Sequence, residues 1–130
     1  MTRDAPLEER GLPRGRPFDP ELETTPRDVK AALESGVAPP ILIDCRRPDE
    51  HERCALRTPG ERLIPMHETA ARLDDLSPYR DREIVVYCHT GRRSLWVARY
   101  LREHGFTKAK SMAGGIDLWS RDIDPTIPRY

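Results

Sequence analysis

The sequence predicts a single α/β domain of three layers, with a central parallel sheet of about five strands and helices on both faces. Short continuous apolar runs at 41–43 (ILI) and 84–88 (IVVYC) are typical of strands buried on both faces. Segments with helical spacing alternate with such runs, and this order produces parallel strands. A chain of 130 residues is long enough to bury one sizeable core and too short for two.

The composition divides the chain into three parts. Residues 1–22 are charged and rich in proline, and we expect an arm that lies on the domain or is partly disordered. Residues 23–122 form the predicted domain. Residues 123–130 hold two prolines, and we expect an irregular tail that packs on the surface of the domain.

Charge and hydropathy exclude several classes of partner. The 22 basic residues balance 22 acidic residues, so no overall field favours nucleic acid or a membrane surface. The longest apolar runs are far shorter than the ~20 residues of a membrane span. The N-terminus lacks the apolar stretch of a secretory signal, and we expect a cytoplasmic protein.

The first half of the chain begins with a helix. Thr25 followed by Pro26 is typical of a helix start and Gly36 of a helix end, which predicts a helix over 26–35. The buried strand ILIDC follows at 41–45.

A turn and two short elements come next. Residues 56–62 (LRTPGER) predict a turn and 63–66 (LIPM) a brief strand. The spacing within 67–76 predicts a helix, and three of its side chains are expected to face the core: Ala70, Leu73 and Leu76.

The second half contains the strongest strand–loop–helix unit. The β-branched strand 82–88 leads through CHTGRRS into a helix that Gly105 ends, with one apolar face made by Val97, Ala98 and Leu101. Residues 107–112 predict another strand. Residues 113–122 predict a short helix whose Ile116 and Trp119 face inward.

Cys88 stands at the carboxyl end of the central strand, directly before a helix. In open parallel sheets sites form at this end, where backbone N–H groups and the helix dipole stabilise an anion such as a thiolate. Gly91 permits a turn that gathers those N–H groups, Ser94 is expected to cap the helix, and Arg92 and Arg93 are expected to lower the pKa of Cys88 further. The sequence therefore predicts a cysteine nucleophile in an anion-binding loop, made by His89, Thr90, Gly91, Arg92, Arg93 and Ser94.

Five segments resemble the motifs of rhodanese-like sulfurtransferases. CHTGRRS resembles their CxxGxRS loop, and IVVYC resembles their central strand. ILIDCR resembles the strand with their Asp-x-Arg signature, carried here by Asp44 and Arg46. PGERLIP resembles their PGAxxIP segment, and AGGIDLW resembles their GGxxxW segment, carried by Gly114, Gly115 and Trp119. The resemblance spans roughly residues 25–120.

The resemblance implies a sulfurtransferase of the thiosulfate:cyanide type. Cys88 would attack a sulfane donor such as thiosulfate, become a persulfide, and pass the outer sulfur to cyanide or a thiol. Arg93 matches the arginine that closes the loop, and Arg92 lies at a variable position, where its charge favours an anionic donor. Asp44 and Arg46 are expected to support the loop structurally, and the chemistry needs no metal or organic cofactor.

Three other functions compete with this interpretation. The domain can be a module that delivers its persulfide to a protein partner, a phosphatase or arsenate reductase of the same fold, or a silent domain. Those phosphatases and reductases use a seven-residue CxxxxxR loop, whereas Cys88 to Arg93 spans six residues, which favours sulfur. Arg57, Thr58 and Glu61 depart from the family pattern near the predicted rim of the site.

The other two cysteines carry no motif. Three cysteines with irregular spacing and no CxxC pair argue against a disulfide framework and a tetrahedral zinc site. Cys45 and Cys54 are expected to be buried and inert. Because the Cys45 strand is predicted to neighbour the Cys88 strand, a regulatory disulfide or a persulfide relay is the less favoured alternative.

Overall fold

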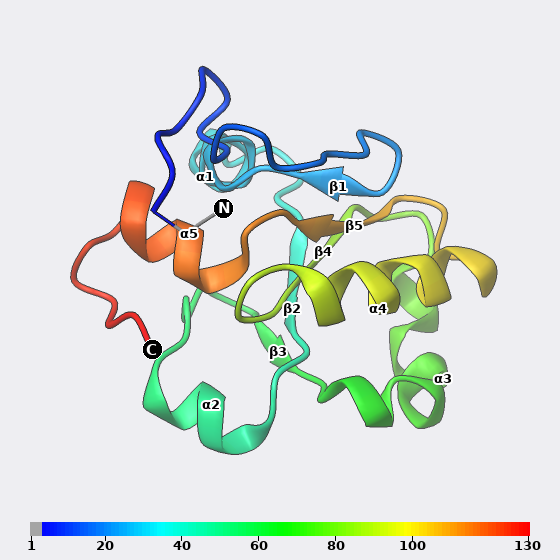
Figure 1. Cartoon of the computed structure of the whole chain (residues 1–130). Coiled ribbons are helices and arrows are strands. Elements are labelled where there is room, and N and C mark those ends of the chain that lie inside the picture. The colour runs from blue at the N-terminus through cyan, green and yellow to red at the C-terminus, as the bar shows by residue number, and fades with distance from the viewer. Residues whose placement is uncertain (1–3) are drawn as a thin grey trace.

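A five-stranded parallel sheet organises the structure, a computed structural model that describes residues 4–130 (Figure 1). The strands lie in the order β1-β5-β4-β2-β3. They are β1 (Glu23–Thr24), β2 (Ile41–Asp44), β3 (Arg62–Leu63), β4 (Ile84–Tyr87) and β5 (Ala109–Met112). The helices are α1 (Pro26–Ser35), α2 (Pro48–Arg53), α3 (Leu73–Leu76), α4 (Arg92–Glu103) and α5 (Gly115–Asp122). The predicted α/β architecture is confirmed.

Alternate side chains of the central strands divide the core into two layers. Leu42 and Val85 face a cluster that includes residues of α1 and α5. Ile43 and Val86 face the opposite cluster, which α3 and α4 cover. Since successive side chains of a strand point to opposite faces, both faces must be covered, and this explains why the strands read as continuous apolar runs.

The local signals at the first helix act as the sequence predicts. The Thr25 hydroxyl accepts a hydrogen bond from the Asp28 amide at 3.1 Å, which caps α1. Gly36 ends the helix in the left-handed conformation at φ 69°. The predicted bounds of this helix, 26–35, are confirmed.

The predicted helix over 67–76 is broken in the structure. Two 3₁₀ turns, Met66–Glu68 and Ala70–Arg72, precede the single turn of α3. Thr69 is buried and its hydroxyl donates to the Met66 carbonyl at 2.8 Å, whereas Ala70 is exposed. A 3₁₀ turn has fewer residues than a turn of α-helix, so different residues face inward. The prediction that Ala70 faces the core was therefore wrong.

One strand and one α-helix were not predicted. The edge strand β1 has only two residues and pairs with β5, so its sequence shows no periodicity. The other is α2, which begins with Pro48 and carries Asp49 and Glu50 in its first turn. A proline at the first position and acidic residues in the first turn both favour the start of a helix. However, α2 is polar on almost every side and therefore shows no apolar spacing.

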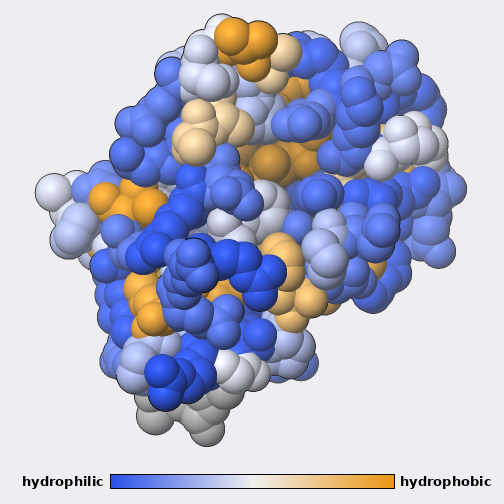
Figure 2. Space-filling model, turned by 90° about the horizontal axis from the view of Figure 1, so that it is seen from above, coloured by the Kyte–Doolittle hydropathy of each residue, from blue (hydrophilic) through white to orange (hydrophobic). Residues whose placement is uncertain are grey.

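Both ends of the described chain pack against the domain. Leu12 is fully buried in a small cluster with Ala113 and Leu118. At the other end, the Tyr130 hydroxyl donates to Glu50 at 2.8 Å. Seen from above, the surface is largely hydrophilic, with hydrophobic side chains in separate patches (Figure 2). Within residues 4–130, no helix is both long and apolar enough to span a membrane.

Candidate active site

Cys88 lies directly after β4, and its sulfur is surrounded by hydrogen-bond donors. The Gly91 amide donates to Cys88 Sγ at 3.1 Å and the Ser94 amide at 3.4 Å. The Ser94 hydroxyl lies 3.3 Å from the same sulfur. Because α4 begins at Arg92, these amides belong to the loop and the first turn of the helix, where N–H groups have no partner within the helix.

Gly91 is required in this loop for two reasons. It adopts φ 102°, a conformation that other residues resist. A Cβ atom at this position would also lie 3.0 Å from the Gly114 amide and 3.1 Å from Arg16 Nη2. The turn that aims the Gly91 amide at the sulfur therefore depends on glycine.

Ser94 does not cap the helix, contrary to the prediction. The N-cap is Gly91, without a side-chain hydrogen bond, and Ser94 is fully buried in the first turn. Its hydroxyl bridges Cys88 Sγ and the Ser111 hydroxyl, the latter at 2.7 Å. Ser94 thus connects the sulfur to β5.

The environment lowers the pKa of Cys88 to about 5. The largest cause is hydrogen bonding with the Cys45 thiol, which stabilises the thiolate. Burial opposes ionisation, and the Ser94 side chain and the Ser94 and Gly91 amides favour it. The predicted low pKa therefore comes mainly from close neutral donors, and Coulombic attraction to Arg93 is a smaller effect.

The two arginines of the loop have different surroundings. Arg93 forms a bidentate ion pair with Glu50 of α2: its Nη1 and Nη2 donate to the two carboxylate oxygens at 2.7 and 3.0 Å. This pair raises the pKa of Arg93 and lowers that of Glu50 to about 2. Arg92 and Thr90 are exposed. Arg93 therefore fastens the loop to α2, and Arg92 is the loop cation that faces solvent.

His89 is held between the loop and the C-terminal tail. Its ring stacks on Tyr130 with the centroids 4.0 Å apart and the planes at 9°. Its carbonyl accepts a hydrogen bond from the Asp117 amide at 3.0 Å. Among the partners within residues 4–130, none bonds the buried His89 Nε2. His89 therefore joins the loop to the tail and to α5.

Asp44 and Arg46 form an ion pair that is 0% exposed on both sides. Arg46 Nη2 donates to Asp44 Oδ2 at 2.7 Å and to the Cys54 carbonyl at 2.6 Å. Arg46 Nη1 donates to the Tyr130 hydroxyl at 2.8 Å. These bonds tie the segment after β2 to the tail, an arrangement that agrees with the expected supporting role.

One cluster within the described chain has the donor types of a metal site: Asp44, His51 and Glu61, whose ligand atoms lie within 4.8 Å of one another. Asp44 is already neutralised by Arg46 and bonded to His51 Nδ1 at 2.8 Å. Glu61 accepts from the Tyr87 hydroxyl at 2.8 Å. These partners satisfy both carboxylates without a metal ion, and Glu61 serves as a structural acceptor.

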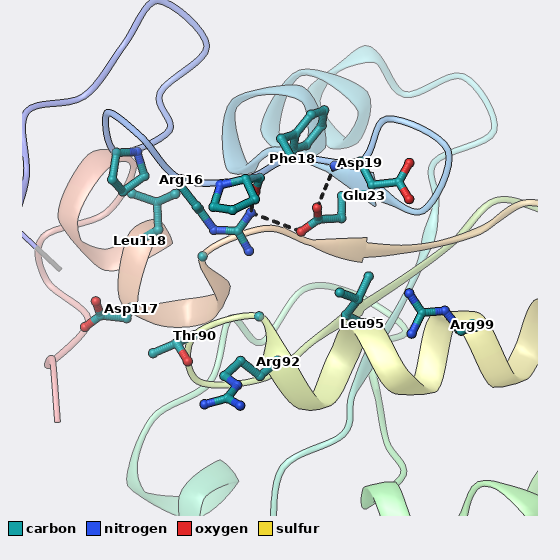
Figure 3. A pocket seen from close by; sticks show the side chains of 14 residues that line it. Arg16, Phe18, Asp19, Glu23, Thr90, Arg92, Leu95, Arg99, Asp117 and Leu118 are labelled. Carbon is teal, nitrogen blue, oxygen red and sulfur yellow. Dashed lines mark hydrogen bonds and ion pairs between the residues drawn. The ribbon is translucent and has the colours of Figure 1, made fainter. Parts of the chain in front are cut away.

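A cavity of about 750 Å³ lies on the other side of the loop (Figure 3). The N-terminal arm forms its roof with Phe18 and Arg16, which pairs with Glu23 at 3.1 Å. Its opposite wall contains Gly91 and Leu95. This volume is within the usual range for small-molecule sites, about 300–1,000 Å³. Gly91 thus separates the cavity from Cys88 Sγ, to which its amide donates.

Sequence reasoning missed two contributors to this site and named a third only as a less favoured alternative. Glu50 is bonded to Arg93 and Tyr130 covers His89, whereas Cys45, the neighbour that the sequence suggested, shares a buried cluster with Cys88. The adjacency of Cys45 follows from strand order, which the sequence suggested. Glu50 lies 43 residues of chain from Arg93 and 80 residues from Tyr130, so only tertiary contacts bring them together, and no motif marks Glu50 or Tyr130.

Comparison with known protein families identifies one match. The rhodanese-like domain family matches residues 25–122. A protein named sulfurtransferase from Allochromatium vinosum is 32% identical over 87 residues, covering 67% of this chain and 78% of that protein.

Longer proteins are also similar. The maize adenylyltransferase and sulfurtransferase MOCS3-1 is 30% identical over 131 residues, covering 97% of this chain. This chain spans only 27% of the length of the maize protein. Among solved structures, a Rhodopseudomonas palustris protein of unknown function, described as a possible tyrosine phosphatase, is 28% identical. Its TM-score is 0.67, and the match covers 84% of this chain and 85% of that chain.

Proposed function

The chain belongs to the rhodanese-like domain family, and we propose that it is a sulfurtransferase that carries sulfane sulfur as a persulfide on Cys88. One observation carries the proposal: the Cys88 sulfur lies among the loop donors, with its pKa lowered to about 5. At neutral pH such a group is almost entirely thiolate, the form that attacks sulfur.

In the first step the Cys88 thiolate attacks the outer sulfur of a donor such as thiosulfate. A bond forms between Cys88 Sγ and that sulfur, the sulfur–sulfur bond of thiosulfate breaks, and sulfite leaves with the electron pair. The product is a Cys88 persulfide whose charge lies on the outer sulfur. The exposed Arg92 attracts the doubly charged donor.

In the second step a nucleophile removes the outer sulfur. Cyanide attacks it, thiocyanate leaves, and the electron pair of the broken bond returns to Cys88 Sγ as thiolate. The Gly91 and Ser94 amides that stabilised the starting thiolate are in place to stabilise it again. A thiol acceptor reacts in the same way and becomes a persulfide itself.

Two features favour sulfur over phosphate as the transferred group. The loop holds six residues from Cys88 to Arg93, one fewer than the loop that wraps a tetrahedral oxyanion. The Arg93 guanidinium is also engaged by both carboxylate oxygens of Glu50, so it is not free to clamp a phosphoryl group. These features weigh against phosphatase activity, despite the likeness to a possible tyrosine phosphatase.

Delivery of the persulfide to a protein partner is the second candidate. The maize relative is named for adenylyltransferase and sulfurtransferase functions in one longer protein, of which this chain spans 27%. A domain that works beside another activity can have a protein as its acceptor. We also infer a reducing setting such as the cytoplasm, because the cycle needs free thiols and all three cysteines are free.

The test is the intact mass of the purified protein after incubation with thiosulfate, followed by the yield of thiocyanate after addition of cyanide. We expect a gain of one sulfur atom directly after loading, and cyanide added at that point should remove it. Cys88→Ser should gain nothing, whereas Cys54→Ser, which changes a thiol on the opposite face of the sheet, should behave as wild type.

Two other results would change the conclusion. A mass gain with negligible thiocyanate turnover favours delivery to a protein acceptor. Failure of thiosulfate and of other sulfane donors to add sulfur contradicts the sulfurtransferase proposal.

A further inference from the structure

Cys45 and Cys88 are neighbours at the ends of adjacent parallel strands. The register pairs Asp44 with Tyr87, so the two cysteines occupy the next matched position, and the Cys45 amide donates to the Tyr87 carbonyl at 3.0 Å. Adjacent strands lie about 4.7–4.9 Å apart. This spacing is within the Cα separations of disulfides, about 4.4–6.8 Å.

The two side chains also point to the same side of the sheet. Both belong to the buried cluster beneath α3 and α4, and each is 1% exposed. Cys54 belongs to the cluster on the opposite face, so the sheet separates it from Cys88. Within the described chain, which contains all three cysteines, Cys45 is therefore the thiol placed to react with Cys88.

The Cys88 sulfur is approached by different elements of the fold. The loop and α4 direct their amides at it, and Cys45, the residue after β2, lies beside it in the buried cluster. A sulfur atom that is added from the loop side lies away from Cys45. The inner sulfur, Cys88 Sγ, therefore stays next to Cys45. Attack on the inner sulfur of a persulfide expels the outer one.

We propose that Cys45 resolves the Cys88 persulfide by attacking Cys88 Sγ, which forms a Cys45–Cys88 disulfide and releases hydrosulfide. This inference rests on the proposed persulfide function. The bond between Cys88 Sγ and the outer sulfur breaks, and the outer sulfur leaves with the electron pair and the proton of the Cys45 thiol. The sulfane sulfur is reduced, and the two cysteine sulfurs are oxidised.

The state of the two thiols prevents attack before sulfur is loaded. Hydrogen bonding to the Cys88 thiolate is the largest cause of the raised pKa of Cys45, so the Cys45 thiol keeps its proton. Loading moves the negative charge from Cys88 Sγ to the outer sulfur, which weakens the hydrogen bonding between the Cys45 thiol and Cys88 Sγ. Cys45 then ionises more easily at the moment when Cys88 Sγ becomes an electrophile.

The disulfide must be reduced before another cycle. A dithiol reductant restores both cysteines by thiol–disulfide exchange and is itself oxidised to a disulfide. The complete cycle turns sulfane sulfur and a dithiol into hydrosulfide and a disulfide. This is a sulfane reductase activity, distinct from transfer to cyanide.

The experiment follows the fate of sulfur loaded onto the full-length protein. Reduced protein is loaded anaerobically with thiosulfate and freed of small molecules, and released hydrosulfide is then trapped over time. Remaining thiols are alkylated in denaturant, and the protein mass and the linked peptides are measured. Release is expressed as a fraction of the loaded sulfur, so that differences in loading between variants do not matter.

Wild type is expected to release hydrosulfide and to lose two alkylation sites, with Cys45 and Cys88 peptides linked. Cys45→Ser keeps a hydroxyl donor beside Cys88 but cannot form the disulfide, and should release about tenfold less of its loaded sulfur. Cys54→Ser should match wild type. Unloaded wild type carried through the same steps should keep both sites alkylated, because the reaction needs the persulfide.

Two outcomes overturn the inference, and they are distinguishable. If the proteins acquire sulfur but Cys45→Ser releases it as fast as wild type, Cys45 does not resolve the persulfide and the proposed function stands. If neither protein acquires sulfur, the proposed function fails and the inference fails with it.

Discussion

At the scale of single residues, the reactivity of Cys88 depends on short contacts with neutral groups. The Cys45 thiol, the Ser94 hydroxyl and two amides act directly on the sulfur. Hydrogen bonds to a charged group are roughly twice as strong as neutral ones, and burial strengthens them. Arg93 contributes less to the thiolate because its charge is largely compensated by Glu50.

Replacing Cys45 with alanine should raise the pKa of Cys88 from about 5 toward its ordinary value. A hydrogen bond to a charged group contributes about 1.5–3 kcal/mol, which corresponds to about one to two pKa units. The measurement is the ultraviolet absorbance of the thiolate as a function of pH, with Cys88→Ser providing the background. In Cys45→Ser the hydroxyl can still donate a hydrogen bond to the thiolate, so the pKa of Cys88 should rise less than in Cys45→Ala. An unchanged midpoint in Cys45→Ala would show that the thiolate does not depend on Cys45.

At the scale of elements, α2 holds the active-site loop from outside the sheet. Glu50 pairs with Arg93 at the start of α4 and accepts a hydrogen bond from Tyr130. It also accepts from the Arg47 amide at 3.2 Å, which closes the first turn of α2. One nearly buried carboxylate thus joins a helix, the loop and the tail.

We predict that Glu50→Gln destabilises the protein by about 1–3 kcal/mol, because it removes the charge that Arg93 requires. The pKa of Glu50 is lowered from 4.5 to about 2, so its stabilising contribution is present above pH 4.5 and is lost as the pH falls toward 2. Urea unfolding between neutral pH and pH 3 should therefore show a smaller loss of stability on acidification in the variant.

The matched control is Asp49→Asn. Asp49 is exposed and bonds Arg47, which is also exposed, so this change should stay within about 0.5 kcal/mol of wild type. Equal effects of the two substitutions would argue against a structural role for the Glu50–Arg93 pair.

At the scale of the whole molecule, segments near both ends of the described residues, 4–130, lie close to the site. The family match covers residues 25–122, and the segments outside it add to the surroundings of the loop. The arm places Arg16 beside Gly91 and forms the roof of the cavity (Figure 3). The tail places Tyr130 on His89. The arm and the tail thus distinguish this site from one built by the common domain alone.

Leu12→Ala should destabilise the protein by about 2–4 kcal/mol, because it opens a cavity against Ala113 and Leu118. The free energy of unfolding in urea measures the effect. Val37→Ala is the control, since Val37 is 78% exposed and should change stability by less than about 0.5 kcal/mol. If Leu12→Ala is as mild as the control, the arm contributes little to the stability of the domain.

The sequence predicted those elements whose signals are local. Helix 26–35 has its cap, its proline and its terminal glycine within a few residues, and β4 has an apolar run between polar residues. Other elements lacked a local signal. Nothing local distinguishes the 3₁₀ turns at Met66–Glu68 from a regular helix, and the polar α2 has no periodicity.

The sequence by itself determined the α/β class and the place of Cys88 at a strand end before a helix. Both follow from short-range rules of periodicity, capping and glycine conformation. The tertiary structure alone decided the partners of that loop. Glu50 on Arg93 and Tyr130 on His89 join residues far apart in the chain. Such contacts arise when the sheet brings distant segments together, and no spacing along the chain records them.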